Sequence, residues 1–284
     1  MVPMKRLLIA GYGDIARRAR PLLETRFELH ALSRTLGMDL DRPASLAALQ
    51  PADAVLHCAP PAAAGAADTR TANLISALEG SRILPTRVVY ISTSGVYGDC
   101  GGAQVDESRA LNPQSERAKR RADAESQLAL WCTSRAIALV ILRAPGIYAA
   151  ERLPLARLRA RMPALRAADD VFTNHIHADD LAAACARALE EDAPAGIYNA
   201  SDDSQLKMGE WLDLVADRAG LPRPPRVARA EADARLPPEQ LSFMRESRRL
   251  VNTRLKRELG FAPRYPTVRE GLDDVRVAGI HEPA

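Results

Sequence analysis

The sequence predicts an α/β fold: a Rossmann-type doubly wound parallel sheet with a smaller, partly interleaved C-terminal substrate lobe. The first observation is that short apolar runs alternate with amphipathic stretches over residues 1–146, as in parallel strands joined by crossover helices. The second is a glycine-rich turn between the first apolar run and the first amphipathic stretch, where such folds bind phosphate groups. The third is the length, because 284 residues suffice for one large domain with an added lobe.

Five apolar runs are expected to form strands. In chain order they are residues 6–11, 27–32, 53–59, 87–93 and 136–143. The amphipathic stretches between these runs predict helices, which lie near 14–25, 68–80 and 113–134. A strand expected near 36–40 is barely present in TLGMDL, so we expect an unusually short crossover there.

The character of the chain changes after the last of these runs. Residues 151–173 are rich in Arg and Ala, and the Pro-rich segment 220–240 cannot hold a long helix. We therefore expect residues 1–150 to form an NAD(P)-binding domain that is completed by 174–200. The smaller lobe is expected to comprise 151–173 and 201–284.

Composition excludes several functional classes. The apolar fraction of 47% and the charged fraction of 26% are those of a globular protein. Basic residues are dispersed among acidic ones rather than clustered with aromatics, so we expect no nucleic-acid partner. The apolar run near the start is too short for a signal peptide or a membrane span, which predicts a cytoplasmic protein. The four Cys show no paired spacing, which argues against a zinc site or a disulfide framework.

The glycine-rich turn has the G-x-G-x-x-A pattern, directly after a strand and at the start of a helix. The first Gly makes the tight turn, the second lets a pyrophosphate approach the backbone, and Ala16 lets helix and strand pack closely. The residues expected to contact a dinucleotide here are Gly11, Tyr12, Gly13, Asp14 and Ile15.

The end of the second predicted strand indicates which dinucleotide is bound. An acidic residue there would bind the adenosine ribose of NAD, but this chain has Ser33, Arg34 and Thr35. A guanidinium and hydroxyls suit the 2′-phosphate of NADP. The chain is so rich in Arg that one often falls in such a position by chance, so NADP is preferred and NAD stays open.

Four later stretches resemble the extended short-chain dehydrogenase/reductase family, often labelled NAD-dependent epimerase/dehydratase. They are VVYISTSGVYGD (88–99), LRAPGIYA (142–149), NHIHADDLAAA (174–184) and GIYNASDD (196–203). The tail RRLVNTRLKRELGF (248–261) is similar to the family's sub-lobe pattern, in which a helix ends at Leu-Gly. The stretches fall in the family's order, and with the tail the resemblance covers nearly the whole chain. The compact G-x-G-x-x-A spacing differs from the family's T-G-x-x-G-x-x-G, which indicates an atypical branch.

The resemblance implies roles for particular residues. Thr93 stands where the family has its active-site Ser or Thr. The remaining cofactor contacts that it implies are Asp39 and Leu40 at the adenine, Ala59 and Pro60 after a central strand, and Pro145 and Ile147 at the nicotinamide. His177 and Asp180 are implied to be structural members of a helix start. The resemblance also implies a homodimer that uses the helix at 113–134.

The family's catalytic Tyr and the Lys four residues after it are missing. Alignment on Glu125 puts Arg117 and Arg121 in their places, and no Tyr-x-x-x-Lys occurs anywhere in the chain. Arg is neither an acid nor a base near neutral pH, but it can bind an anion or stabilise an oxyanion. The two Arg lie on one helix face, either as an active-site wall or as a solvated basic stripe.

Other groups could donate the proton. Tyr148 on the nicotinamide-side loop is the first candidate and Tyr97, on the loop after Thr93, is another, although a Tyr in either place more often only packs. His57 is a further candidate by its residue type, but a lone His at a strand end is more often a packing residue. His175 and His177 alternate on a predicted strand, but no further ligand cluster follows, so no metal is expected.

Two functions remain open. The first is an NAD(P)-dependent oxidoreductase or epimerase/dehydratase-like enzyme acting on a polar small molecule such as a nucleotide sugar, with a non-standard proton donor. The second is a non-catalytic NAD(P)-binding sensor or regulatory protein. Thr93 favours the first, and the missing Tyr and Lys favour the second.

Overall fold

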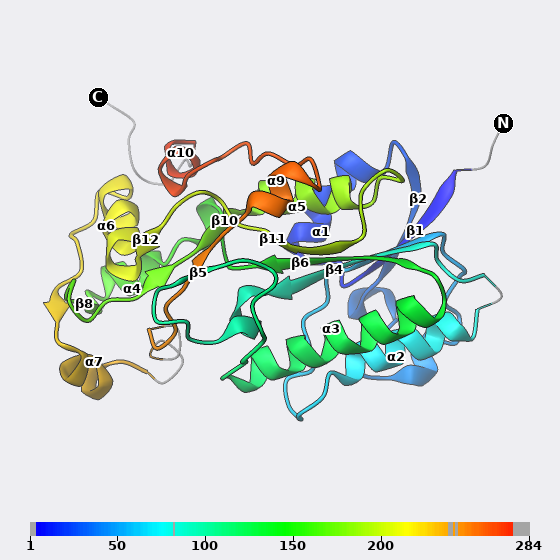
Figure 1. The fold of residues 1–284 in the computed structure, drawn as a ribbon, viewed down its shortest axis with the longest axis horizontal. Coiled ribbons are helices and arrows are strands. Elements are labelled where there is room, and N and C mark those ends of the chain that lie inside the picture. Colours follow the sequence, from blue (N-terminus) through cyan, green and yellow to red (C-terminus); the bar gives the residue numbers. More distant parts are fainter. Residues whose placement is uncertain (1–3, 82, 238–240, 242–243, 275–284) are drawn as a thin grey trace.

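The computed structural model describes residues 4–81, 83–237, 241 and 244–274. Six parallel strands form its central sheet (Figure 1). They are β1 (Lys5–Ala10), β2 (Phe27–Leu32), β3 (Ala54–His57), β4 (Arg87–Thr93), β6 (Ala138–Ala144) and β11 (Gly196–Asn199). The order across the sheet is β11-β6-β4-β3-β1-β2, so the direction of winding reverses between β1 and β3. The predicted doubly wound α/β fold is confirmed.

Helices cover both faces of the sheet. On one face α1 (Asp14–Leu23) packs beside α5 (Ala178–Ala188), and on the other α2 (Thr69–Glu79) packs beside α3 (Glu116–Ser134) (Figure 1). Successive β1 side chains point to opposite faces. Leu7 and Ile9 accordingly pack with α1 and α5, whereas Leu8 and Ala10 pack with α2 and α3.

The weak strand near 36–40 is absent from that described stretch. Two short 3-10 helices, η1 (Arg34–Leu36) and η2 (Pro43–Leu46), make the crossover from β2 to β3 instead. As a result β2 is the edge of the sheet, and residues 33–46 lie over its carboxyl end, on the side of the glycine-rich turn.

The C-terminal lobe lies beyond the carboxyl ends of the strands, at the left of Figure 1. Its helices are α4 (Leu155–Arg159), α6 (Met208–Arg218), α7 (Arg229–Arg235) and α10 (Val268–Asp273). Two small strand pairs belong to it: β8 (Ala164–Leu165) with β13 (Arg226–Val227), and β9 (Phe172–Thr173) with β12 (Leu206–Lys207). Among the described residues of the Pro-rich segment the only helix is the short α7, and β13 precedes it.

The lobe is interleaved with the sheet because the chain passes between them repeatedly. β7 (Gly146–Tyr148) pairs with β10 (His175–His177), and β5 (Gln104–Val105) pairs with β14 (Arg249–Leu250), which leads to α9 (Thr253–Arg257). Between these passages β11 pairs in parallel with β6 and extends the sheet.

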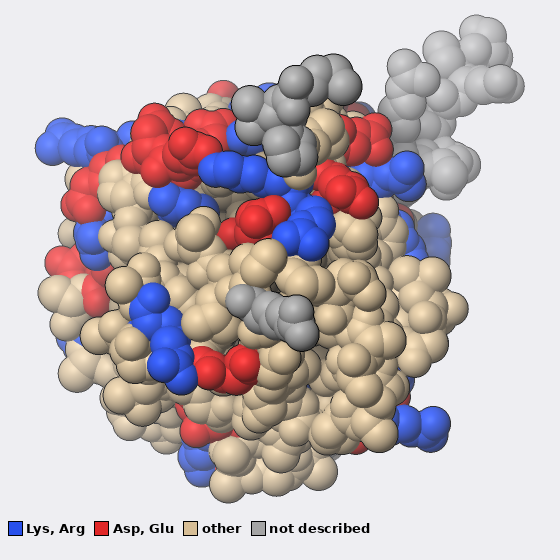
Figure 2. Space-filling view, turned by 90° about the vertical axis from the view of Figure 1, so that its right-hand side faces the viewer, with Lys and Arg blue, Asp and Glu red and all other residues tan. Residues whose placement is uncertain are grey.

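Charged side chains of both signs are mixed at the end of the molecule shown in Figure 2. Near the amino ends of the strands, Lys5 pairs with Glu191, and Arg26 with Glu190.

The family resemblance implies that α3 forms a dimer interface. Leu130 on this helix is 76% exposed. The dimer itself stays a prediction. No helix within the described ranges has the length and apolar character needed to cross a bilayer.

Candidate functional site

A cavity of about 620 Å³ opens where the lobe meets the carboxyl ends of β4 and β6. Four parts of the chain line it: the turn after β4, the first turn of α3, the segment after β6, and the lobe. Of the predicted residues, it brings together Thr93, Arg117, Pro145, Ile147 and Tyr148. Ligands of doubly wound folds bind at this edge of the sheet.

The turn after β1 has the shape that a dinucleotide requires. Gly11 has φ +91°, and a Cβ there would lie 2.5 Å from the backbone N of Ala59, so only Gly fits this close approach to the end of β3. A Cβ on Gly13 would meet nothing within 4 Å, which leaves open space beside the backbone where a pyrophosphate would lie. Tyr12, Asp14 and Ile15 continue the turn into α1, where free N–H groups favour an anion.

The predicted adenosine contacts lie on two neighbouring loops. Ser33, Arg34 and Thr35 follow β2, with the Ser33 and Thr35 hydroxyl oxygens 2.9 Å apart. Asp39 and Leu40 come next, and Ala59 and Pro60 follow β3. Sequence reasoning missed Arg70, which joins the loops by an ion pair with Asp41 (2.6 Å) and a hydrogen bond to the Pro60 carbonyl (3.1 Å).

The nicotinamide side of the cavity is formed by β4 and the segment after β6. Thr93 ends β4, and its Oγ1 accepts a hydrogen bond from the backbone N of Gly95 (3.2 Å). The O–H of Thr93 is therefore free to donate to a ligand oxygen in the cavity. Pro145 and Ile147 line the same cavity.

Arg117 and Arg121 have different surroundings although they lie one turn apart on α3. Arg117 is exposed and lines the cavity, and partial desolvation together with the charge of Arg121 lowers the pKa of its guanidinium. Arg121 is only 6% exposed. It donates to the carbonyl of Ile91 (2.7 Å) and the hydroxyl of Tyr90 (3.0 Å), with Ala59 O at 3.4 Å. The solvated-stripe interpretation is therefore wrong for Arg121.

A buried ion pair sets the position of α3 on the sheet. Glu125 and Arg143, whose side chains are 5% and 4% exposed, approach to 2.7 Å. Ser92 also donates to Glu125, and Arg143 donates to the hydroxyl of Tyr97 (2.9 Å). Separating a buried pair of this kind leaves an uncompensated charge, so the pair opposes displacement of α3 from β6. Of these residues, the sequence offered only the acidic one as a signal.

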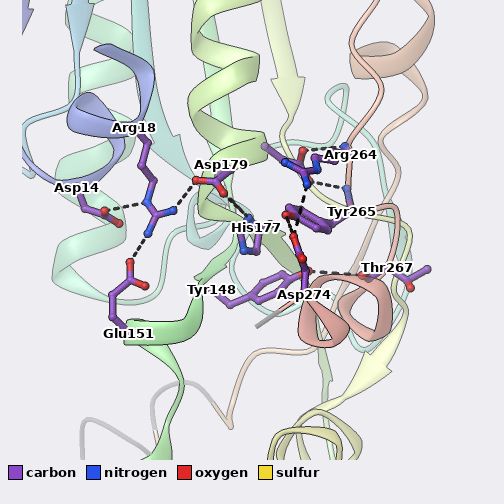
Figure 3. Close-up of polar contacts among 11 residues, drawn as sticks. Asp14, Arg18, Tyr148, Glu151, His177, Asp179, Arg264, Tyr265, Thr267 and Asp274 are labelled. Atoms are coloured by element: carbon purple, nitrogen blue, oxygen red, sulfur yellow. Dashed lines mark hydrogen bonds and ion pairs between the residues drawn. The ribbon is translucent and has the colours of Figure 1, made fainter. Parts of the chain in front are cut away.

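Tyr148 borders the cavity, but its hydroxyl lies toward the lobe. The side chain is 1% exposed, and the hydroxyl oxygen is 3.5 Å from the carbonyl oxygen of Thr267 (Figure 3). Burial, followed by the nearby carboxylates of Asp202 and Asp180, raises the pKa of the phenol far above its ordinary value. To act as a proton donor, Tyr148 would have to turn its hydroxyl away from Thr267.

β10 and the lobe contribute cavity residues that sequence reasoning did not assign to the site. His175 packs on Trp211 with ring centroids 4.4 Å apart, and Tyr148 meets the His175 ring edge-on. Burial lowers the pKa of His175 to about 3, so its ring is neutral at pH 7. Glu246 and Arg248 complete this wall. Only the position of His175 just before the helix-start motif could have indicated its place in the site.

His177 and Asp180 have the structural roles that the resemblance implies. His177 Nδ1 accepts a hydrogen bond from the backbone N of Asp179 (3.2 Å) and so caps α5. The Asp180 carboxylate accepts from the backbone N of Arg264 (2.7 Å) and of Tyr265 (3.0 Å). In the part of the chain that the structure describes, no group of three or more His, Cys, Asp or Glu side chains is placed to hold a metal ion.

A cluster of ion pairs joins the dinucleotide turn to the cavity (Figure 3). Arg18 on α1 pairs with Asp14 (2.9 Å), with Glu151 after β7 and with Asp179 on α5. Arg152, which lines the cavity, also reaches Asp14 (2.8 Å). Burial acts to raise the pKa of Asp14, but hydrogen bonds from Arg18 and Arg152 outweigh it and lower that pKa.

Comparisons with solved structures reproduce the fold over nearly the whole chain. A protein of unknown function from Silicibacter pomeroyi DSS is 28% identical, with a TM-score of 0.76 over 95% of this chain and 97% of that one. RMD from Pseudomonas aeruginosa, complexed with NADPH, is 21% identical with a TM-score of 0.72, over 95% and 97%. The human epimerase family protein SDR39U1 with NADPH is 19% identical with a TM-score of 0.73, over 95% and 98%.

Sequence comparisons give two curated relatives. GDP-6-deoxy-D-mannose reductase of Pseudomonas aeruginosa is 28% identical over 225 residues, which are 68% of this chain and 74% of the relative. The 3-diazoavenalumate denitrifying reductase of a Streptomyces species is 30% identical over 100 residues, which are 35% of this chain and only 33% of that protein. The family model for the NAD dependent epimerase/dehydratase family matches residues 4–201. The chain belongs to the NAD dependent epimerase/dehydratase family.

Proposed function

We propose that the protein is an NADP-preferring oxidoreductase or epimerase/dehydratase that acts on a polar small molecule such as a nucleotide sugar. The observation that carries this proposal is the shared cavity. Thr93, Pro145 and Ile147, which family resemblance alone marks as active-site residues, line one cavity at the carboxyl ends of the strands. A relative that reduces a nucleotide sugar, GDP-6-deoxy-D-mannose reductase, supports the substrate class.

The residues present fit a bound dinucleotide. The open space beside Gly13 would receive the pyrophosphate, and Pro145 and Ile147 would contact the nicotinamide amide. Ser33, Arg34 and Thr35 would bind a 2′-phosphate, which is why we prefer NADP. When bound, the cofactor supplies or accepts a hydride at its nicotinamide ring.

Thr93 would act on the substrate oxygen, because its free O–H would donate a hydrogen bond to it. The charge of Arg117, on the same cavity, would attract an anionic group of the substrate. Arg117 cannot deliver the proton at neutral pH. Tyr148 remains the proposed donor, on the condition that its hydroxyl leaves Thr267.

The second candidate is a non-catalytic NAD(P)-binding sensor or regulatory protein. The observation in its favour is that Arg117 and Arg121 stand where the family's Tyr and Lys are expected. Neither guanidinium transfers a proton near neutral pH. Under this alternative the cavity would bind a ligand without transforming it.

Turnover distinguishes the two candidates. Nicotinamide absorbance would be followed while the purified chain, with NADPH, is offered sugar nucleotides and simpler carbonyl compounds. We expect oxidation of NADPH with at least one substrate, and a loss in kcat/KM of roughly 100-fold in Thr93→Val, because one donor to the developing oxyanion is removed. The control is Thr133→Val, at an exposed position of α3, which should keep full activity.

The same assay tests Tyr148 and the alternative. If Tyr148→Phe keeps the wild-type rate, another group delivers the proton. Tight NADPH binding without turnover on the whole panel would overturn the enzyme proposal in favour of the sensor.

A further inference from the structure

Arg117 is a cavity cation without a counter-charge among the described residues. Two other guanidiniums line the cavity, and both are paired: Arg152 with Asp14 (2.8 Å) and Arg248 with Glu246 (2.7 Å). Arg117 has no hydrogen bond or ion pair within the described ranges. Its charge therefore lies beside the cavity with nothing from those parts of the chain to neutralise it.

Arg121 adds a second positive charge behind Arg117. It lies one helical turn further along α3, and its partners are carbonyl and phenol oxygens rather than a carboxylate. The next acidic residue on this helix face, Glu125, is already paired with Arg143. Like charges at this spacing repel each other. An anion in the cavity would relieve that repulsion.

The positive charge lies close to the expected point of reaction. A Cβ on Gly95 would be 3.5 Å from the Thr93 hydroxyl oxygen and 3.6 Å from the Cβ of Ala118, the neighbour of Arg117. The width of one residue thus separates the Thr93 hydroxyl from the first turn of α3. Thr93 and Arg117 line the same cavity, so one ligand could contact both.

We propose that the substrate carries a carboxylate next to, or a few bonds from, the carbon that reacts, and that Arg117 binds this carboxylate. The inference rests on the proposed function and makes its substrate class specific: an acid, such as a uronate sugar, rather than its neutral analogue. The planar guanidinium matches a carboxylate through two parallel N–H donors. Arg117 is then a specificity-determining residue at the place of the family's proton donor.

Matched pairs of ligands isolate the carboxylate. UDP-glucuronate is compared with UDP-glucose, and D-glucuronate with D-glucose, because each pair differs at one carbon that is either a carboxylate or a neutral CH2OH group. Binding to the full chain is measured by calorimetry, with and without saturating NADPH. We expect the acid of at least one pair to bind roughly 10- to 100-fold more tightly than its neutral partner, the usual effect of a hydrogen bond between charged groups.

Variants assign the preference to Arg117. Arg117→Gln should remove it, and Arg117→Lys should retain part of it, because the charge stays while the planar fork is lost. Lys119→Gln is the matched control: it removes one positive charge from the same helix, where Lys119 pairs with the exposed Glu116 outside the cavity. This variant should bind the acid as the wild type does. Unchanged thermal unfolding of all three variants would show that they are folded.

The outcomes separate this inference from the proposed function. If wild-type protein binds neither member of each pair, or binds both equally, or if Arg117→Gln keeps the preference, the carboxylate proposal is overturned. Displacement of the acid by inorganic phosphate at the same concentration would also overturn it, in favour of a phosphate site. A failure to bind NADPH would instead count against the proposed function, while the titrations without NADPH still decide the role of Arg117.

Discussion

Arg117 and Arg121 have different surroundings, although they lie one helical turn apart on α3. Both have guanidiniums that stay charged near neutral pH, so neither repeats the proton transfer of a Tyr activated by Lys. Arg121 instead donates hydrogen bonds to the backbone carbonyls of Ile91 in β4 and of Ala59, which follows β3. It therefore links the carboxyl ends of these two strands. Arg117 keeps its charge available to the cavity.

Asp202 is a buried carboxyl whose charge is poorly compensated. It is 3% exposed, Oδ1 accepts from the backbone N of Ser204 (2.9 Å), and Oδ2 has no partner in the described ranges. Burial raises its pKa to about 8. Between pH 4 and pH 8 the unfolded chain therefore loses this proton while the folded chain keeps it. Stability is lost as pH rises through that window.

Asp202→Asn should remove this pH dependence, because the amide resembles the protonated carboxyl and can still accept from Ser204. A pKa difference of one is worth about 1.4 kcal/mol, so the wild type should lose at least about 2 kcal/mol relative to the variant between pH 5 and pH 8. Urea unfolding of both proteins at the two pH values measures the difference. If the free energy of unfolding changes equally with pH in the wild type and the variant, Asp202 ionises in the folded protein as it does in the unfolded chain.

At the scale of elements, the turn between β1 and α1 contains two glycines, of which the fold requires one and a bound ligand would require the other. Gly11 has φ +91° and lies against the backbone of Ala59, so it is required by the fold itself. Gly13 has φ −89° and free space around its Cβ position, so nothing in the described protein requires it. Only an approaching ligand gives a reason for the second glycine.

This contrast predicts opposite behaviour for two alanine variants. Gly11→Ala should lower the free energy of unfolding by about 1–3 kcal/mol, because of its strained φ and its clash with Ala59. Gly13→Ala should change stability by less than about 1 kcal/mol, because the poorer N-cap offsets the stiffer unfolded chain. It should weaken dinucleotide binding at least 10-fold, because the new methyl group crowds the pyrophosphate. Chemical denaturation and NADPH titration measure the two effects. Wild-type affinity in Gly13→Ala would show that the pyrophosphate binds elsewhere.

The ion-pair cluster around Arg18 joins three elements near this turn. Asp14 belongs to α1, Glu151 to the segment after β7, and Asp179 to α5 (Figure 3). Arg152 connects the same Asp14 to the cavity. These ion pairs therefore connect Glu151 and the cavity residue Arg152 to α1, the helix expected to face the cofactor phosphates.

At the scale of the whole molecule, the sheet was predictable because its central strands, such as β3 and β4, are apolar runs buried on both faces. The runs at 27–32 and 87–93 match β2 and β4 as predicted, and the missing strand near 36–40 was visible as a missing apolar run. The order of the family motifs was enough to single out Thr93, Pro145 and Ile147, and these three residues line one cavity.

The lobe side of the cavity could not be predicted in the same way. β5 and β14 are two residues long and pair across more than a hundred residues of sequence, too short for any periodic pattern. Trp211 and Arg248 reach the cavity only through such distant contacts. The burial of Arg121 could not be predicted from the sequence either. Its partners are the backbone carbonyls of Ala59 and Ile91 and the hydroxyl of Tyr90, and no sequence pattern indicates such contacts.

Calorimetric titration of the full chain with NADPH and NADH tests the central claim most directly, since cofactor binding underlies every role proposed for the cavity. The prediction is one dinucleotide per chain, with NADPH about 10-fold tighter than NADH, as expected for a guanidinium on the 2′-phosphate. Arg34→Ala should abolish that preference, whereas Arg109→Ala, at an exposed position outside the site, should keep it. Equal affinities that Arg34→Ala leaves unchanged would contradict the preference for NADP. No binding of either dinucleotide at millimolar concentration would contradict the account as a whole.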